Sequence, residues 1–283
     1  MLSCGPGAGD RVQESLPSAS PPAAEASPAA PPAPREIPSV DPTAAQDPDP
    51  VGDLLGRIEQ SAEDLRTFQA NVTYRRWDAV LERREIRTGT FYYQIRDGSK
   101  RFAIRFDRLF IGNRLRKQNK HFVFDGGWFI EIDHEARTII KRQIVAPGER
   151  FDPLSLGEGP FPLPIGQSKE RVLARFVVTP LARSDNDWLA ERIEGRRVDG
   201  LLLVPKPSTP EAKNLSQVEL FYDRRTLLPV GVHATEPDGD TRTVYLSDLK
   251  RNQGIDERHF KVQEHDPKEG WRIDSRPWKD LGE

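Results

Sequence analysis

Residues 218–262, VELFYDRRTLLPVGVHATEPDGDTRTVYLSDLKRNQGIDERHFKV, alternate apolar and polar side chains with a period of two. The chain is expected to reverse direction at residues 224–227 and again at residues 237–240. The second turn contains Pro237, which restricts φ, and Gly239, which tolerates a positive φ. Period-two alternation over successive strands is typical of an antiparallel sheet with one apolar face. The stretch therefore predicts an antiparallel sheet. The side chains predicted to face its core are Leu220, Tyr222, Val232, Val244 and Leu246.

Earlier segments repeat the alternation and predict further strands at 68–77, 86–95, 101–106, 121–125 and 128–133. Together with strands expected at 139–145 and within 177–205, they predict one sheet of roughly ten to twelve strands. The side chains predicted to face the same core are Val72, Phe91, Tyr93, Phe102, Ile104, Phe106, Phe124, Trp128 and Ile130.

Two helices are expected beside these strands. Residues 50–68 carry an apolar stripe at 3.6-residue spacing, with Asp49 as a cap and Pro50 at the first helical position. Residues 168–176 predict a second, short helix. The first stripe includes Leu55, Ile58 and Leu65, whose side chains are predicted to face inward onto the sheet.

Residues 148–167 interrupt the pattern with four prolines among six large apolar residues, which include Phe161 and Leu163. Prolines keep a segment out of the interior of a regular sheet. Exposed to water, the apolar side chains would form a patch of a kind that monomers avoid. We expect either a lid over the open face of the sheet or a loop packed on its edge.

Composition divides the chain. Residues 1–50 hold 12 of the 25 prolines and no periodic apolar pattern, so they predict a disordered tether. Residues 51–275 are expected to form one domain with a substantial core, followed by a short tail at 276–283. No run of 18 apolar residues predicts a membrane-spanning helix.

Several short motifs resemble those of the outer-membrane lipoprotein carrier family (LolA-like). They are a strand ending in Asp, a Leu-Pro turn, an acidic-Gly hairpin, and a Leu-x-Asp-x-x-x-Asn run followed by Ile-Asp and Phe. In this chain they are Tyr222-Asp223, Leu228-Pro229, Asp238-Gly239, Leu246 to Asn252, Ile255-Asp256 and Phe260.

The resemblance implies an α+β fold in which a strongly curved antiparallel half-barrel encloses an apolar cavity. On the composition of the Pro-rich insert, we expect that segment to form a lid over the open face. The resemblance also implies that the inward residues named above bind the acyl chain of a lipid or lipoprotein in the periplasm or cell envelope. No cofactor or metal is expected, and the protein is expected to be a monomer.

Residues 96–120 carry nine basic and two acidic side chains. One explanation is the solvated outer face of a strand and loop. The other is a docking patch for anionic lipid headgroups or an acidic membrane-protein partner, with Arg96, Arg114, Arg116 and Lys117 as its cations. Nucleic acid is not expected, because the aromatic residues of this segment alternate inward instead of forming a stacking surface.

Cys4 is the only cysteine, so no intrachain disulfide forms. Leu2-Ser3-Cys4 resembles the end of a bacterial lipobox, whose cysteine is acylated and anchors a lipoprotein. Only three residues precede Cys4, fewer than a signal peptide needs. We expect either an acylated cysteine with a start further upstream or an inert thiol on the tether.

The sequence contains no nucleophile elbow, P-loop or metalloprotease motif, and its five histidines are scattered along the chain. We therefore expect a binding protein without enzymatic activity. Three functions remain open: a carrier of acyl chains, a tethered envelope sensor or interaction module with the same fold, and a hydrolase with an unrecognised site, for which His259 and Asp256 would be tested first.

Overall fold

Twelve strands form one sheet in the part of the chain that a computed structural model describes, residues 49–112, 114–146, 149, 154, 156, 161, 163–263 and 265–278. Asp49 and Pro50 are the only residues of the predicted tether in these ranges, and Cys4 lies outside them. The strands are β1 Thr67–Asp78, β2 Arg83–Arg96, β3 Ser99–Ile111, β4 Arg114–Asp125, β5 Trp128–Asp133, β6 Thr138–Gln143, β7 Phe176–Pro180, β8 Val198–Pro205, β9 Gln217–Asp223, β10 Pro229–Thr235, β11 Thr241–Arg251 and β12 Arg272–Arg276.

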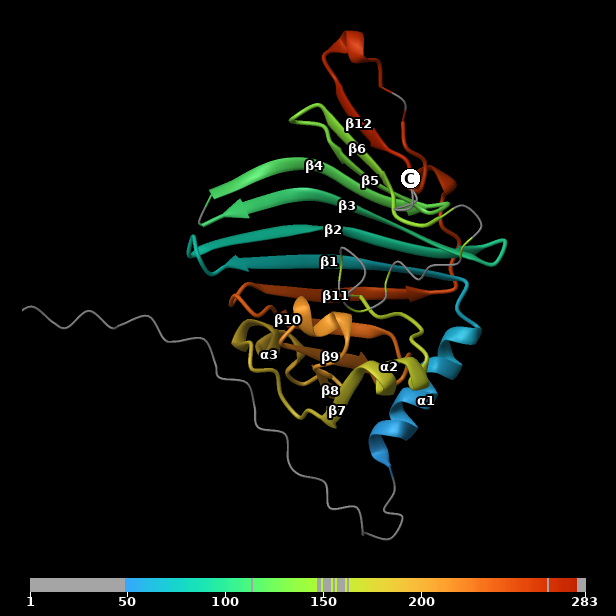
Figure 1. Ribbon diagram of the computed structural model, residues 1–283, viewed down its shortest axis with the longest axis vertical. Helices are drawn as coiled ribbons and strands as arrows, with labels where there is room; N and C mark the ends of the chain where they lie inside the picture. Colours follow the sequence, from blue (N-terminus) through green and yellow to red (C-terminus); the bar gives the residue numbers. More distant parts are fainter. Residues whose placement is uncertain are drawn as a thin grey trace, which may run out of the picture. The chain divides into compact units, whose positions relative to one another are not determined.

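The strand order is β12-β6-β5-β4-β3-β2-β1-β11-β10-β9-β8-β7. Every neighbouring pair is antiparallel except β12 and β6, which are parallel. The sheet is curved and does not close, so β12 and β7 are its two edges (Figure 1). In its centre β1 pairs with β11, where Phe68 lies opposite Arg251 and Trp77 opposite Thr241. This architecture is an open, mostly antiparallel half-barrel, as the sequence predicts.

In these described ranges, three α-helices accompany the sheet: α1 Pro50–Glu63, α2 Lys169–Arg175 and α3 Asp187–Ile193. Asp49 caps α1, because its side chain accepts a hydrogen bond from the Gly52 amide at 2.8 Å. The helix ends at Glu63 and is shorter than predicted. Phe68 belongs to β1, because an apolar residue at this place on the helical stripe also suits the buried face of a strand. None of these helices is long and apolar enough to cross a membrane.

The two faces of the sheet carry different cores. The face that we call the inner face holds the largest buried cluster, to which all strands from β1 to β4 and from β7 to β11 contribute, together with α1 and α2. On the opposite, outer face, α3 packs over β8, β9 and β10, and the chain after β11 crosses β2, β3 and β4 with Phe260 against Tyr92. The outer face is therefore covered at both places, whereas the inner face holds most of the predicted ligand-binding residues.

A bulge between β2 and β3 requires a residue without a side chain. A Cβ atom on Gly89 would lie 1.9 Å from the carbonyl oxygen of Arg105 on β3. We expect Gly89→Ala to lower the free energy of unfolding by about 1–3 kcal/mol, because the two backbones must move apart. Urea unfolding measures the loss.

Gly56→Ala is the matched control, because Gly56 lies inside α1 with no atom within 4 Å of an added Cβ. It should raise the free energy of unfolding by about 0.5–1 kcal/mol, since alanine is the better helix former. Equal stability of the two variants would contradict the close approach at Gly89.

Candidate functional site

The inner face gathers most of the predicted lipid-binding residues into one place. Seventeen of the nineteen belong to a single buried cluster, although they come from α1, the link from α1 to β1, seven strands and the segment before α2. Their role in binding lipid stays a prediction. They are Leu55, Ile58, Leu65, Val72, Phe91, Tyr93, Phe102, Ile104, Phe106, Phe124, Phe161, Leu163, Leu220, Tyr222, Val232, Val244 and Leu246.

The prediction was wrong for Trp128 and Ile130, which lie on the outer face. The turn at Gly126–Gly127 pairs Phe124 with Phe129, so Phe129 packs on the inner cluster. Ile130 packs instead with the outer cluster around Phe260. A change of register by one residue moves every side chain of a strand to the other face, and this turn sets the register.

Phe161 lies at the centre of the aromatic part of the inner face. Its ring centroid is 5.1 Å from that of Phe122, 5.8 Å from Tyr74 and 6.4 Å from both Phe102 and Phe106. These partners come from β1, β3 and β4, and most of the contacts have the edge-to-face or tilted geometry that aromatic pairs favour. Phe161 therefore covers the surface that the sequence assigns to an acyl chain.

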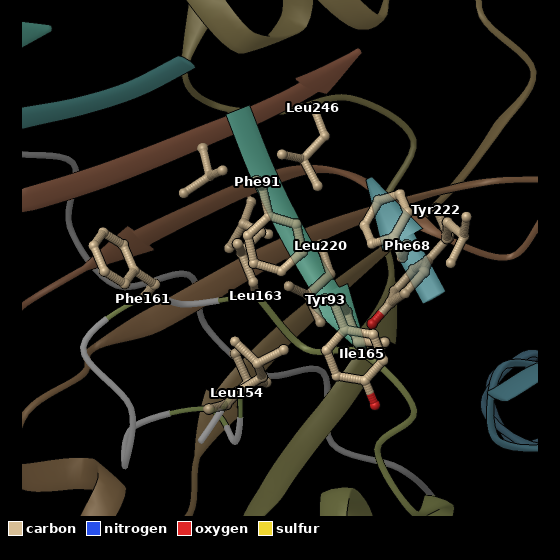
Figure 2. Packing of buried hydrophobic residues seen from close by; sticks show 14 of the residues in the cluster. Phe68, Phe91, Tyr93, Leu154, Phe161, Leu163, Ile165, Leu220, Tyr222 and Leu246 are labelled. Atoms are coloured by element: carbon tan, nitrogen blue, oxygen red, sulfur yellow. The ribbon is translucent and has the colours of Figure 1, made fainter. Parts of the chain in front are cut away.

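Four further apolar side chains of the Pro-rich segment are buried in the same cluster as Phe161. Leu163 and Ile165 lie among inner-face residues such as Leu220 (Figure 2). The described residues of the segment before α2 belong to neither helix nor strand. We call this set the covering residues: Leu154, Leu156, Phe161, Leu163 and Ile165.

A hydrogen bond to Tyr222 joins this segment to the core of the sheet. The Tyr222 hydroxyl donates a hydrogen bond to the Pro164 carbonyl oxygen at 3.3 Å. Burial raises the pKa of Tyr222, so the hydroxyl stays protonated and keeps its role as donor. A mobile lid stays a prediction, because residues 150–153, 155, 157–160 and 162 lie outside the described part of the chain.

An open cleft of about 940 Å³ lies away from these residues, between the first turns of α1, the edge strand β7 and its neighbour β8. Leu54 and Leu201 line it, and both also belong to the inner cluster. Asp199 accepts from Arg57 at 3.2 Å and from Arg224 at 2.7 Å across the cleft. None of the predicted lipid-binding residues lines this cleft, so it is a separate opening beside the core.

The four predicted docking cations do not form one patch. Arg96 ends β2, where its Nη1 lies 2.9 Å from Oε2 of Glu257. Arg114, Arg116 and Lys117 begin β4, at the other end of the 13-residue strand β3. At about 3.3 Å per residue, roughly 40 Å separates the two groups. The prediction of a single patch that includes Arg96 was therefore wrong.

Three histidines that are scattered in the sequence lie close together in the structure, which the sequence did not predict. The ring centroids of His121 and His134 are 5.0 Å apart, those of His134 and His265 are 5.6 Å apart, and His265 stacks on Trp271 at 3.7 Å. Burial and the nearby Arg105 guanidinium lower the pKa of His121 to about 4. The β4–β5 hairpin brings His121 to His134. His265 joins them because the chain after β11 returns to β4 and β5, a contact with no local signal in the sequence.

Within the residues that the structure describes, no three His, Cys, Asp or Glu side chains are grouped so that they could hold a metal ion.

Comparisons with known proteins complete the description of the site. No protein-family model matches the chain. No curated protein matches its sequence. Solved structures do match, at low sequence identity.

One such match is the complex structure of Pseudomonas aeruginosa MucA/MucB, with 16% identity and a TM-score of 0.44 over 75% of this chain and 61% of that chain. The chain thus spans less than two thirds of that protein's length. The Mycobacterium tuberculosis lipoprotein LppX matches with 10% identity and a TM-score of 0.40 over 74% of this chain and 98% of that chain.

A LolA superfamily protein from Nitrosomonas europaea matches with 10% identity and a TM-score of 0.31 over 75% of this chain and 97% of that chain. With TM-scores below 0.5, these similarities carry no argument about what the chain binds.

Proposed function

We propose that the protein binds acyl chains of lipids or lipoproteins on the inner face of its half-barrel and carries them, without enzymatic activity, within the bacterial cell envelope. The observation that supports this most is the way the inner face is covered. Phe161 contacts rings on β1, β3 and β4, but the described residues of its own segment belong to no strand. Side chains held in this way can give up their position to a ligand without breaking a sheet ladder.

The inner face offers an acyl chain enough stabilisation. Each buried CH2 group contributes about 0.8 kcal/mol, so a 16-carbon chain gains on the order of 12 kcal/mol before the cost of association. An acyl chain that displaces Phe161 exchanges one apolar surface for another. The covering residues therefore keep the ligand-free protein soluble and weaken apparent binding by the fraction of time that they stay in place.

The hydrogen bond between Tyr222 and Pro164 is consistent with displacement of the covering residues by an acyl chain. It links the segment that carries those residues to β9. A neutral hydrogen bond contributes about 0.5–1.5 kcal/mol, which is enough to favour the covered state and small enough for a lipid to overcome. The resemblance of the sequence to LolA-like carriers agrees with the proposal.

Phe161→Ala tests the proposal. We expect this variant to bind a fluorescently labelled 16-carbon fatty acid at least several-fold more tightly than the wild type, because the side chain that competes for the site is gone. Tyr222→Phe keeps the ring and removes only the bond to Pro164. It should shift affinity in the same direction by less.

Ile193→Ala is the matched control, because Ile193 is 6% exposed, as Phe161 is, but it belongs to α3 and packs on the outer face. It should lose stability without a gain in affinity. Failure of both the wild type and Phe161→Ala to bind the fatty acid would contradict the proposal. Release of bound fatty acid to acceptor vesicles would favour a carrier, and retention would favour a sensor.

A further inference from the structure

One end of the sheet exposes apolar side chains beside a group of cations. In the described residues, five large hydrophobic side chains are exposed, and three of them lie here: Val80 at 84%, Leu81 at 62% and Leu115 at 59%. Val80 and Leu81 lie in the turn between β1 and β2, and Leu115 is the second residue of β4. Because Glu85 on β2 pairs with Ile111, the two hairpins lie side by side in the sheet (Figure 1).

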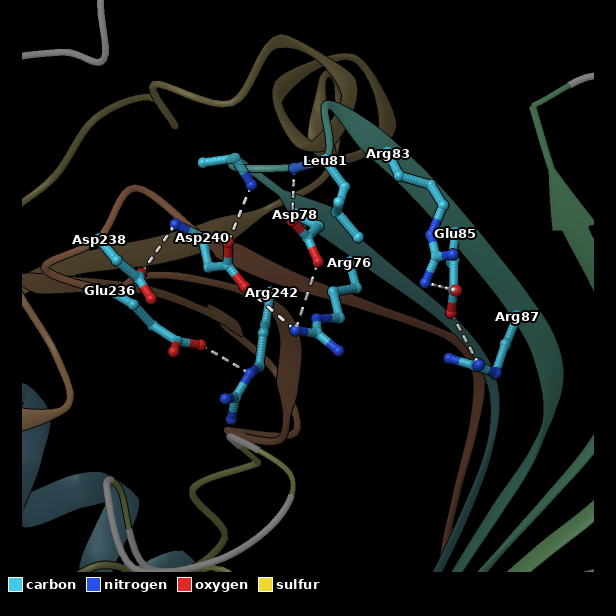
Figure 3. Close-up of polar contacts among 11 residues, drawn as sticks. Arg76, Asp78, Leu81, Arg83, Glu85, Arg87, Glu236, Asp238, Asp240 and Arg242 are labelled. Atoms are coloured by element: carbon cyan, nitrogen blue, oxygen red, sulfur yellow. Dashed lines mark hydrogen bonds and ion pairs between the residues drawn. The ribbon is translucent and has the colours of Figure 1, made fainter.

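Polar contacts hold the β1–β2 turn in place, so its exposed residues are part of a fixed structure. Asp78 accepts a hydrogen bond from the Leu81 amide at 2.8 Å. From the β10–β11 turn, Asp240 accepts from the Ala79 amide at 2.9 Å and from Arg76 at 3.1 Å (Figure 3). These bonds lower the pKa of Asp240, which therefore stays charged as an acceptor.

The charge around the three apolar residues is positive. Residues 78–87 and 108–117 together carry seven basic and three acidic side chains. Glu85 is already neutralised by Arg83 at 3.0 Å and Arg87 at 2.8 Å. Within the described part of the chain, Arg114, Arg116 and Lys117 have no ion-pair partner and stay exposed.

We infer that this end of the sheet docks on an anionic membrane surface, with Val80, Leu81 and Leu115 entering the boundary between headgroups and acyl chains. Apolar side chains at the tips of hairpins suit a bilayer, which yields to a protruding shape. The flanking Arg114, Arg116 and Lys117 then face the phosphates of anionic headgroups, which attract cations within a Debye length of the surface.

An acidic protein partner fits these observations less well. A stable protein interface buries about 800 Å² on each partner around a packed apolar centre. Three apolar residues on two narrow hairpins offer much less. Charge attraction combined with shallow insertion is the usual way in which surfaces of this size bind membranes.

Vesicle flotation tests the inference with the full chain. We expect binding to vesicles of phosphatidylcholine with 30% phosphatidylglycerol, and at least tenfold weaker binding to phosphatidylcholine alone. Arg114→Gln/Arg116→Gln/Lys117→Gln should weaken binding at least tenfold and flatten its dependence on salt. Val80→Ser/Leu81→Ser should weaken binding while the salt dependence remains.

Ile273→Ser is the matched control, because Ile273 is an exposed apolar residue on β12. It should bind the vesicles as the wild type does. Insertion is measured separately with a polarity-sensitive dye on Leu81→Cys, after Cys4, the only cysteine, is changed to serine. The dye should move to an apolar environment only with anionic vesicles.

Equal binding to both kinds of vesicle, or unchanged binding of the triple charge variant, would overturn the inference. Absence of binding to anionic vesicles would overturn it in favour of an acidic protein partner. The test is independent of the proposed acyl binding, which is measured without vesicles and through residues of the inner face.

Discussion

Phe102→Ala should lower the free energy of unfolding by about 3–5 kcal/mol. Phe102 is fully buried on β3, and its ring centroid lies within 6.5 Å of those of Phe91, Phe124, Phe129 and Phe161. Truncation removes the transfer free energy of the ring and leaves a cavity that strands on both sides cannot close. The sheet ladder holds those strands at a spacing of about 4.8 Å. Urea unfolding measures the effect.

Trp128→Ala tests whether Trp128 lies on the outer face, as the structure shows, or on the inner face, as the sequence predicts. Had Trp128 faced the inner cluster, its loss would cost as much as that of Phe102. On the outer face it is only partly buried, so we expect a loss at least about 2 kcal/mol smaller. Similar losses in the two variants would contradict the register of β4 and β5.

Acidification from pH 6.5 to pH 4 should lower the free energy of unfolding by several kcal/mol. His233 is buried with its Nδ1 3.0 Å from the Thr243 hydroxyl, and burial lowers its pKa to about 4. In the unfolded chain a histidine has a pKa of about 6.5, so the unfolded state gains the proton first as pH falls. The folded state therefore keeps its full stability with respect to His233 above about pH 6.5, and loses it as the pH falls from about 6.5 to about 4.

The size of this effect follows from the shift. At about 1.4 kcal/mol per pKa unit, His233 alone contributes on the order of 3 kcal/mol. His121, whose pKa is also lowered to about 4, is only partly buried and contributes less. Urea unfolding at several pH values measures the total. His233→Gln should reduce the slope of stability against pH over this range, and an unchanged slope would contradict the assignment.

The inner face could be predicted from sequence because one strong pattern specifies it. Alternation in β9 and β11 places Leu220 and Leu246 on one face wherever the strands end up, since each side chain follows its own backbone. The helical stripe of α1 works in the same way for Ile58. For such residues the local period and the need to bury apolar surface lead to the same answer.

The errors have different physical causes. Trp128 and Ile130 were misassigned because their face depends on how many residues the turn at 126–127 contributes, which alternation within each strand does not reveal. Arg96 and Arg114 lie in one basic segment of the sequence, but β3, which runs between them, places them at opposite ends of the sheet. The helix α3 was missed because it has only seven residues, although Asn186, which accepts from the Leu189 amide at 3.0 Å, is a recognisable cap.

The histidine cluster could not be predicted from one sequence. His121 and His134 are neighbours through the β4–β5 hairpin, whereas His265 is brought to them by the crossing of the chain over the outer face after β11. That path depends on the anchoring of Phe260 against Tyr92, Ala103 and Val123, a long-range fit of shapes with no period of its own.

The pairing of β1 with β11 has a consequence for the order in which the fold can assemble. Strands β1 to β6 are joined by short hairpins, and so are β7 to β11 except for longer links on either side of β8. Each group can form early as a local meander. The ladder between them joins Trp77 to Thr241, so its loop-closure entropy is large and must be overcome late. On the ribosome, the first six strands therefore wait with an unpaired edge at β1 until the last quarter of the chain has emerged.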